Sequence, residues 1–578
     1  MWRSSRLDIG VALFLLVLYV NAQQNWQTNG NPQNPGQNNW QNSGQPNTNW
    51  QNNNGQPNPN WQNNNNNPNP NWQNSNNPNS NSNWQNNGQN DNWSNNGQGQ
   101  NNNNNNNWQN QNNQQYGNNN SQDDCCEDYC YVTDEEPYLN FATKTAYDSL
   151  NRRSNSQHLV PECTPIQFWT IIRHGTRLPS AEKIEKLRGL NRLHEEILMN
   201  YGKRRSYPDK GRLCREDYDL FTRWRWNDTV TPERGNALTS QGVEDLKLLA
   251  SRYKSKYSQI LQAPYDERAF YFQYENLDRT HDSYQAYIEG LFGSEAYRVH
   301  ANTLNDERLS KPDDSCRTLE ERQTQTIDFR NEYHSFTFSA DYSKMVHDVF
   351  KRLGFRYNLN ASVISDMYDL CRYEKAWNVQ QRSAWCIAFT KSHLKLLEYG
   401  EDLKHYYKSG YGNRLSERIG CSPLKDLYER FEKTVNGDNT GPKATFFFTK
   451  AATLLNVLTA MGIGKEYTPL TAQNYYQHSR RKWRTSELSP FAGNLAAILY
   501  ECRGSEKYKV MFFLNEMPVE FPECSVGLCN WSSVEQKYQG LVKNCNVNDL
   551  CSENLASTSS LSYILYAVTA ATLLYLRI

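Results

Sequence analysis

The chain changes composition abruptly near residue 120, and this boundary decides which part of it can fold. The chain has 61 basic and 61 acidic residues, yet residues 1–120 carry only four of them: Arg3, Arg6, Asp8 and Asp91. All 14 cysteines follow residue 120. Residues 23–122 are almost entirely Asn, Gln, Gly, Pro and Ser, with widely spaced tryptophans. Such a composition buries too little apolar area to offset chain entropy, which predicts a disordered region over 23–122 and a folded region after it.

The Asn/Gln region has two interpretations. Its tryptophans recur irregularly and most of them precede Gln-Asn, so each is an apolar point in a polar chain. Asn/Gln-rich segments of this kind can self-associate, which would make the region a site of adhesion or assembly. A neutral spacer is the alternative, and the sequence leaves both open.

The N-terminus has the layout of a signal peptide. Arg3 and Arg6 precede the apolar run 11–20, and Val20-Asn21-Ala22 offers a small-residue cleavage site. A membrane anchor is the alternative, but the apolar run is short for a membrane span. We therefore expect residues 1–22 to be a cleaved signal peptide.

The C-terminus, residues 553–578, predicts a membrane attachment. A polar stretch over 553–560 precedes the mostly apolar run 561–578. This is the order of a GPI-anchor signal, and a short transmembrane anchor ending at Arg577 is the alternative. Together the two ends predict export, with the chain secreted or held at the extracellular face of the plasma membrane. The zero net charge gives no reason to expect nucleic acid as a partner.

The cysteines fit this prediction. An even number in an exported chain predicts disulfide bonds, although spacing does not give their pairing. A zinc site at Cys126-x3-Cys130 is the rival interpretation, but neither a paired C-x2-C nor a histidine supports it, so no metal is predicted. Sequons at Asn227, Asn360 and Asn530 suit a glycosylated surface.

Strands and helices alternate at both ends of the folded region. Short β-branched and aromatic runs predict strands over 167–172, 444–448, 495–501 and 508–514. Helical spacing of apolar residues predicts helices over 180–201, 242–257, 281–292 and 451–461. The sequence between is mostly helical. This pattern predicts an α/β core with a helical cap inserted into it.

The motif with the clearest chemistry follows the first predicted strand directly. It reads Arg173-His174-Gly175-Thr176-Arg177-Leu178-Pro179. Arginine guanidiniums suit phosphate oxygens, and a neutral imidazole among them can attack phosphorus. We expect Gly175 to let the backbone approach a ligand closely. A basic surface turn is the alternative, which the strand before and the helix after the motif disfavour.

The motif resembles the RHGxRxP signature of histidine acid phosphatases. Further segments resemble one branch, the multiple inositol polyphosphate phosphatases, and the likeness covers nearly all of 140–550 in order; these segments are 231–250, 278–292, 367–377, 384–389, 398–412 and 446–551. The resemblance implies a histidine-phosphatase core sheet flanked by helices. It places the domain at 123–552, with the cap formed by roughly 181–230 and 295–440.

The resemblance also implies roles for single residues. His174 aligns with the nucleophile that forms a phosphohistidine, while Arg173, Arg177 and Arg279 align with arginines that hold the phosphate. The chain departs from the family where His-Ala-Glu is expected, because it has Lys450-Ala451-Ala452. Lys450 can still bind phosphate as a cation near a helix start. Ala452 cannot protonate a leaving group, so the general acid is missing there.

Three functions follow from these observations. The resemblance implies a hydrolase of inositol polyphosphate phosphomonoesters that needs no cofactor, and the missing acid predicts slow turnover. The second possibility is an inactive pseudophosphatase that binds phosphorylated inositols. The third is an adhesion or assembly protein in which the Asn/Gln region associates with itself. His281, His347 and His478 are the nearest substitutes for the acid by residue type. Each is a weak candidate, because a general acid must lie within hydrogen-bond reach of the leaving oxygen whatever its residue type.

Overall fold

The structure is a computed structural model that describes residues 128–150, 160–203, 210–262, 264–301 and 327–546. The predicted signal peptide 1–22, the Asn/Gln region 23–122 and the membrane attachment 553–578 lie outside these ranges, so they stay predictions. Among the described helices, none combines the length and the apolar character that crossing a membrane requires.

The described strands form one mixed sheet in the order β2-β3-β1-β4-β5-β6, with β7 paired to β5. The first three strands are parallel, whereas β4 and β5 join antiparallel. The strands are β1 (Cys163–Arg173), β2 (Phe270–Tyr274), β3 (Ala444–Thr449), β4 (Asn494–Cys502), β5 (Tyr508–Leu514), β6 (Met517–Pro518) and β7 (Leu528–Asn530). All four predicted strands are present, and the short strands β2, β6 and β7 were not predicted.

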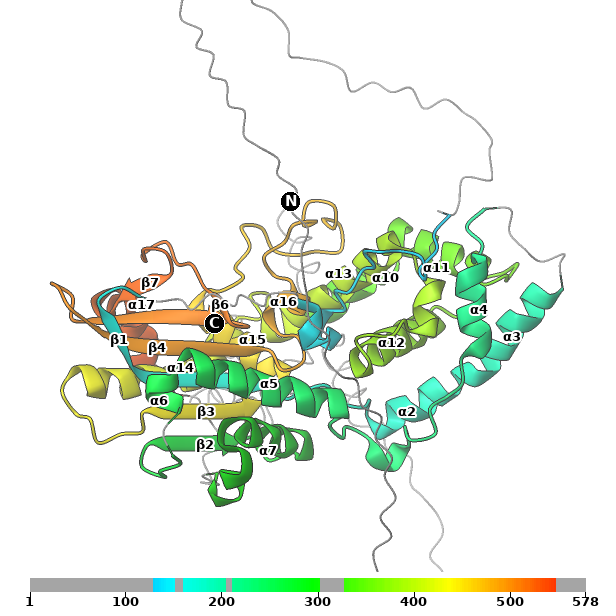
Figure 1. Cartoon of the computed structure of the whole chain (residues 1–578). Coiled ribbons are helices and arrows are strands. Elements are labelled where there is room, and N and C mark those ends of the chain that lie inside the picture. Colours follow the sequence, from blue (N-terminus) through cyan, green and yellow to red (C-terminus); the bar gives the residue numbers. More distant parts are fainter. Residues whose placement is uncertain (1–127, 151–159, 204–209, 263, 302–326, 547–578) are drawn as a thin grey trace, which may run out of the picture. The chain divides into compact units, whose positions relative to one another are not determined.

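The two faces of the sheet are covered by different helices (Figure 1). Successive side chains of a strand point to opposite faces, so Phe168 and Ile172 pack with one group of helices while Trp169 and Ile171 pack with the other. The first group is α5 (Ser240–Lys256), α6 (Ser258–Leu261) and α7 (Asp278–Phe292). The second group is α14 (Ser416–Val435), α15 (Ala451–Met461) and α17 (Trp531–Lys543).

The remaining long helices gather at one end of the sheet, as Figure 1 shows. They are α2 (Ala181–Arg188), α3 (Leu190–Gly202), α4 (Arg215–Arg223), α10 (Ile327–Thr337), α11 (Ala340–Arg352), α12 (Ser362–Trp377) and α13 (Lys391–Ser409). Short helices complete the described elements: α16 (Thr485–Leu488), η1 (Ala142–Lys144), η2 (Tyr147–Leu150), η4 (Pro232–Arg234), η5 (Gly293–Arg298) and η6 (Ala384–Ala388). The predicted α/β class and the sheet flanked by helices are confirmed.

One predicted helix is wrong in detail. The helix predicted over 180–201 is two helices, α2 and α3, which meet at Gly189. Ser180 caps α2 by accepting a hydrogen bond from the Lys183 amide at 3.4 Å. Glycine costs about 1 kcal/mol in a helix interior, which makes Gly189 a natural break in an otherwise periodic segment.

Five disulfide bonds join described cysteines, as the even count predicted: Cys130–Cys214, Cys163–Cys502, Cys371–Cys386, Cys421–Cys545 and Cys524–Cys529. The bond between Cys163 and Cys502 joins β1 to β4, and the bond between Cys371 and Cys386 joins α12 to η6. Cys130, Cys214 and Glu216 lie close enough to bind a metal ion, but the two sulfurs are bonded to each other. Cys130 therefore forms a disulfide bond and is not a ligand of the zinc site considered as an alternative in the sequence analysis.

Candidate active site

The motif loop leaves the sheet at the end of β1. Arg173 is the last residue of β1 and pairs in register with Thr449 of β3. The His174 amide donates to the Thr449 carbonyl at 2.9 Å, and the His174 carbonyl accepts from the Ala492 amide at 3.0 Å. His174 is thus fixed on both backbone sides at the carboxyl edge of the parallel strands, where ligands bind in many α/β sheets.

The segment before α5 holds the rest of the loop. The Thr176 carbonyl accepts from both the amide and the hydroxyl of Thr239, at 2.9 and 3.0 Å. The Leu178 amide donates to the Ala237 carbonyl at 2.9 Å. On the other side, the Gly175 amide donates to the Ser283 hydroxyl of α7 at 3.1 Å. These contacts give the loop a single defined path between α5 and α7.

Gly175 makes a close backbone contact within the fold, and its predicted approach to a ligand stays a prediction. A Cβ at this position would lie 2.7 Å from the carbonyl oxygen of Gly242, and a Cβ on Gly242 would lie 2.3 Å from the Thr176 carbonyl oxygen. The close approach is therefore between the loop and the start of α5. The two glycines let these backbone segments pack directly against each other, which fixes the position of the motif loop on α5.

His174 has the geometry of a nucleophile. Its side chain is 3% exposed, and Nδ1 lies 2.9 Å from the Gly175 carbonyl oxygen. Because a carbonyl can only accept, Nδ1 carries the proton and Nε2 keeps its lone pair. Burial, followed by the charges of Arg173, Arg177 and Arg279, lowers the pKa of His174 well below its usual value. This lowered pKa favours the neutral imidazole, the form that can act as a nucleophile.

The guanidinium of Arg173, which was predicted to hold phosphate, makes several contacts with other groups of the protein. One of its terminal nitrogens donates to the carbonyls of Thr143 and Ser489, and its guanidinium lies 4.6 Å from the centre of the Phe491 ring. Burial, with the charges of Arg177 and Arg279, lowers its pKa. Arg173 is thus placed beside the other two arginines, with its orientation set by backbone carbonyls far away in the sequence.

Arg177 and Arg279 approach the imidazole from different elements. Arg177 lies in the loop and donates to the Asn236 side chain at 2.9 Å, while Arg279 is the second residue of α7. The charges of both act on His174 and on Arg173. The Nε groups of Arg173 and Arg177 are buried and lack a hydrogen-bond partner among the described residues. The structure therefore places the three arginines close enough to His174 for their charges to lower its pKa.

Lys450 and Ala452 lie at the start of α15, directly after β3. Lys450 is the N-cap of the helix, with its side chain 18% exposed, and its Nζ lies 3.6 Å from Oε1 of Glu275. Glu275 follows β2 and is fully buried. Sequence reasoning did not single out Glu275; the only local signal is an acid after a short aromatic run. Ala452 ends in a methyl group, so this helix start supplies no acid at that position.

The three substitute histidines lie in different surroundings. His281 is on α7, 45% exposed, beside Asp282 at 3.4 Å. His347 is exposed on α11. His478 is buried, where it contacts Thr468 at 3.3 Å and Glu466 at 3.9 Å. Among the contacts of the described residues, none links any of the three to His174.

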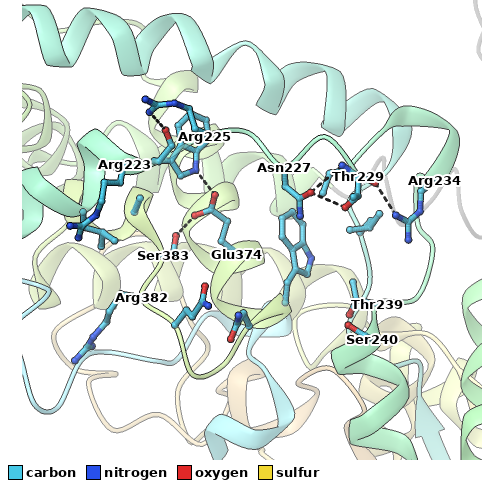
Figure 2. A pocket seen from close by; sticks show the side chains of 18 residues that line it. Arg223, Arg225, Asn227, Thr229, Arg234, Thr239, Ser240, Glu374, Arg382 and Ser383 are labelled. Atoms are coloured by element: carbon cyan, nitrogen blue, oxygen red, sulfur yellow. Dashed lines mark hydrogen bonds between the residues drawn. The ribbon is translucent and has the colours of Figure 1, made fainter. Parts of the chain in front are cut away.

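A cavity of about 480 Å³ borders the outer side of the motif loop (Figure 2). Leu178 lines it, and so does Trp377, whose indole nitrogen donates to the Arg177 carbonyl at 3.2 Å. In Figure 2, Glu374 accepts hydrogen bonds from Trp224 and Ser383, at 2.7 and 2.6 Å. Burial raises the pKa of Glu374 to about 7. His174 is not among the lining residues, so this cavity is a neighbour of the candidate active site rather than part of it.

The comparison with protein families agrees with this geometry. Residues 166–515 match the family model of the histidine phosphatase superfamily (branch 2). The chain belongs to this family. The matched range contains the motif loop, the start of α7 and the start of α15, so the whole candidate site lies within it.

The similar curated proteins point to one branch of the family. The chain is 37% identical over 417 residues to multiple inositol polyphosphate phosphatase 1 of Drosophila melanogaster, which covers 72% of this chain and 88% of that protein. It is 27% identical to the Homo sapiens protein of the same name, over 73% of this chain and 90% of that protein. A thiamine-repressible acid phosphatase of Schizosaccharomyces pombe is 25% identical, over 64% and 78% of the two chains. The predicted family resemblance is confirmed.

Solved structures share the fold. The phytase from D. castellii matches with a TM-score of 0.55 at 18% identity, over 70% of this chain and 85% of that one. The Bifidobacterium longum multiple inositol polyphosphate phosphatase, solved with inositol hexasulfate, matches with a TM-score of 0.52 at 15% identity, over 69% of this chain and 97% of that one. At these identities the likeness concerns the fold.

Proposed function

We propose that the chain is a phosphoric monoester hydrolase that acts on inositol polyphosphates through a phosphohistidine at His174. One observation carries the proposal: a buried imidazole whose pKa is lowered by burial and then by the charges of three guanidiniums. Two of those guanidiniums have buried Nε donors without a partner among the described residues. Buried donors are normally satisfied, and a phosphate dianion supplies the missing acceptors and the opposite charge.

The chemistry has two half-reactions. Nε2 of His174 attacks phosphorus, the P–O bond to the ester oxygen breaks, and the leaving oxygen departs with the bonding electrons and takes up a proton to give the alcohol. Water then attacks the phosphohistidine and releases inorganic phosphate. In this scheme Arg173, Arg177 and Arg279 stabilise the charge on the transferring phosphoryl group, and Lys450 adds a fourth cation at the start of α15. No cofactor or metal is needed.

The substrate class rests on the relatives rather than on the geometry of this chain. The Drosophila and human relatives are named as multiple inositol polyphosphate phosphatases, and each is covered over most of its length. A pocket with several cations suits a polyol that carries several phosphates. We therefore assign inositol polyphosphates as the ligand class, in preference to a simple phosphomonoester.

The missing acid at Ala452 predicts slow turnover of such substrates. A positioned acid contributes roughly 10²–10⁴-fold when an alkoxide must leave. An aryl oxide leaves without a proton and is affected less. The test is phosphate release from an aryl phosphate and from inositol hexakisphosphate by the purified chain and by His174→Ala. The aryl ester should be cleaved far better, and only by the chain that retains His174.

A pseudophosphatase is the second candidate function, and the Lys450-Ala451-Ala452 sequence favours it. Such a protein would bind phosphorylated inositols and release them unchanged. Equal affinity of the parent chain and His174→Ala for inositol hexakisphosphate, with no phosphate release from either ester, would support this function over the hydrolase.

The regions outside the described residues add three parts to the proposal. The signal peptide 1–22 directs export, and the segment 553–578 attaches the chain to the extracellular face of the plasma membrane by a GPI anchor or a short span. The Asn/Gln region 23–122 provides a site for self-association. Deleting residues 23–122 and measuring self-association by light scattering tests the last part; unchanged association would reduce the region to a spacer.

A further inference from the structure

Glu275 is a buried carboxylate that lies in the candidate active site. It is fully buried, its Oε1 lies 3.6 Å from Lys450 Nζ, and its Oε2 accepts from the Thr449 hydroxyl at 3.3 Å. A buried carboxylate is costly unless a cation and hydrogen bonds compensate for it. The pairing therefore fixes the Lys450 ammonium at this point of the site.

The backbone places this pair next to the nucleophile. Glu275, Lys450 and His174 follow β2, β3 and β1, which are neighbours in the sheet. The Glu275 amide donates to the Phe448 carbonyl and the His174 amide to the Thr449 carbonyl, both at 2.9 Å. Lys450 thus stands between the carboxylate and the imidazole in the order of the strands.

The same pair borders the phosphate-binding arginine of α7. The Glu275 carbonyl accepts from the Leu277 amide at 2.7 Å and from the Thr280 hydroxyl, which holds the start of α7 against the end of β2. Arg279 lies between Leu277 and Thr280. Lys450 therefore lies at the same sheet edge as His174 and the start of α7, and Ala452, two residues later, has no proton to donate.

We propose that Lys450, positioned by Glu275, donates the proton that the leaving alkoxide requires. This inference rests on the proposed hydrolase function. In the first half-reaction the Nε2–P bond forms, the P–O bond to the alcohol breaks, and one Lys450 ammonium proton passes to the leaving oxygen. In the second, the Lys450 amine takes a proton from the attacking water as the P–O bond forms and the N–P bond breaks, which restores the ammonium and the neutral imidazole.

The chemistry of the two side chains suits these roles. An alkoxide is a far stronger base than an amine, so the transfer from an ammonium is favourable. Glu275, whose Oε1 lies 3.6 Å from Nζ, holds the ammonium group of Lys450 in place before the reaction. An ammonium is a weaker acid than a carboxylic acid, so the step is slower than with a glutamic acid at position 452. Lys450 is the catalytic residue in this scheme, and Glu275 is a positioning residue.

Lys450→Arg separates proton donation from charge. Arginine retains the cation and the pairing with Glu275, but it does not give up a proton in proteins. We expect the ratio of kcat for an alkyl phosphate such as glycerol 2-phosphate to kcat for p-nitrophenyl phosphate to fall by about 10²-fold relative to the parent chain. Equal rates of Lys450→Arg and the parent chain on the alkyl ester would overturn the proposal.

Glu275→Gln and Glu275→Asp test the positioning role. We expect Glu275→Gln to lower kcat on the alkyl ester with little change in KM, and Glu275→Asp to restore part of the rate. A role confined to folding would instead lower the rates on both esters together. Lys450→Met alone would leave the buried Glu275 carboxylate without its cation and could prevent folding. The double variant Lys450→Met with Glu275→Gln removes both charges and should fold. It should also lose activity on the alkyl ester.

A phosphohistidine intermediate, labelled from radioactive p-nitrophenyl phosphate during turnover, distinguishes this inference from the proposed function. Acid-sensitive phosphoryl label on the parent chain, with Lys450→Arg fully active on the alkyl ester, would leave the hydrolase standing and remove the role of Lys450. Absence of the label from the parent chain during turnover of p-nitrophenyl phosphate would remove both.

Discussion

The candidate active site has two sides, and they are built differently. On the β1 side, the loop after β1 and the start of α7 bring His174, Arg177 and Arg279 together, in agreement with the family motif. On the β3 side, the start of α15 has Lys450 paired with Glu275, and Ala452 where a proton donor is expected. In the proposed mechanism, the first side holds phosphate and attacks it, whereas the second serves the leaving group. Binding and turnover can therefore be altered independently in this chain.

The largest effect is expected on the β1 side. His174→Ala removes the nucleophile and should lower turnover of p-nitrophenyl phosphate by roughly 10⁴-fold or more, as removal of other enzymatic nucleophiles does. Because the arginines remain, binding of inositol hexakisphosphate should persist, as measured by calorimetry. Full activity of this variant would show that the attacking group lies elsewhere.

Removal of one cation from the same side should have a smaller effect. Arg279→Gln takes one charge-stabilising group from the transition state and should lower kcat/KM for p-nitrophenyl phosphate by about 10²-fold. Arg188→Gln is the matched control, because Arg188 is an exposed arginine on α2 that pairs with Glu185 at 3.7 Å. Steady-state kinetics of the two variants gives the comparison, and equal rates for both would place Arg279 outside the site.

Restoring a proton donor on the β3 side should raise turnover of inositol hexakisphosphate but not of p-nitrophenyl phosphate. Lys450→His combined with Ala452→Glu supplies an acid at the start of α15, and kcat on inositol hexakisphosphate should rise by about 10²-fold. Turnover of p-nitrophenyl phosphate should change little, because its leaving group needs no proton. If phosphate release from both esters stays the same, other parts of the pocket have diverged as well.

The pH profile reports the environment of His174. A histidine with the ordinary pKa of about 6.5 would be mostly protonated at pH 5 and lose roughly 30-fold in nucleophilic activity. Burial and the three arginines lower the pKa of His174, so its neutral form persists there. We expect kcat/KM for p-nitrophenyl phosphate, corrected for substrate ionisation, to fall by less than about threefold between pH 6.5 and pH 5. A steep loss centred near pH 6.5 would contradict this.

The smallest effect concerns α5, which supports the β1 side. Burial raises the pKa of Asp245 to about 7, so ionisation of this carboxyl costs stability as pH rises from its ordinary pKa through 7. Asp245→Asn should raise Tm by a few degrees at pH 8 and hardly at all at pH 4, since about 1 kcal/mol or more is at stake. Asp219→Asn, at an exposed aspartate of α4, is the control in calorimetry.

Local patterns predicted the β1 side, whereas the β3 side depends on contacts between distant residues. The motif around His174 is contiguous, and the strand before it has a clear apolar pattern, so both were visible in the sequence. Glu275 pairs with Lys450 across two strands, and β2 is too short to stand out. The carbonyls of Thr143 and Ser489 that orient Arg173 come from opposite ends of the domain. Only the fold brings such groups together.

The glycines also show that the sequence does not reveal contacts between distant residues. The sequence identified Gly175 as special, because a glycine inside a charged motif suggests a close backbone approach. It did not identify Gly242 of α5 as a backbone segment that approaches Gly175 in the fold. In the same way, the periodic segment 180–201 predicted helix correctly but not the break at Gly189.

The central claim is that His174 carries the phosphoryl group during turnover. The most direct measurement is an acid or base quench of the purified chain within one turnover of phosphorus-labelled p-nitrophenyl phosphate, followed by peptide mapping. The account predicts one base-stable, acid-sensitive phosphoryl group on the peptide that contains His174, absent from His174→Ala. Turnover without any labelled protein, or label that survives in His174→Ala, would contradict it.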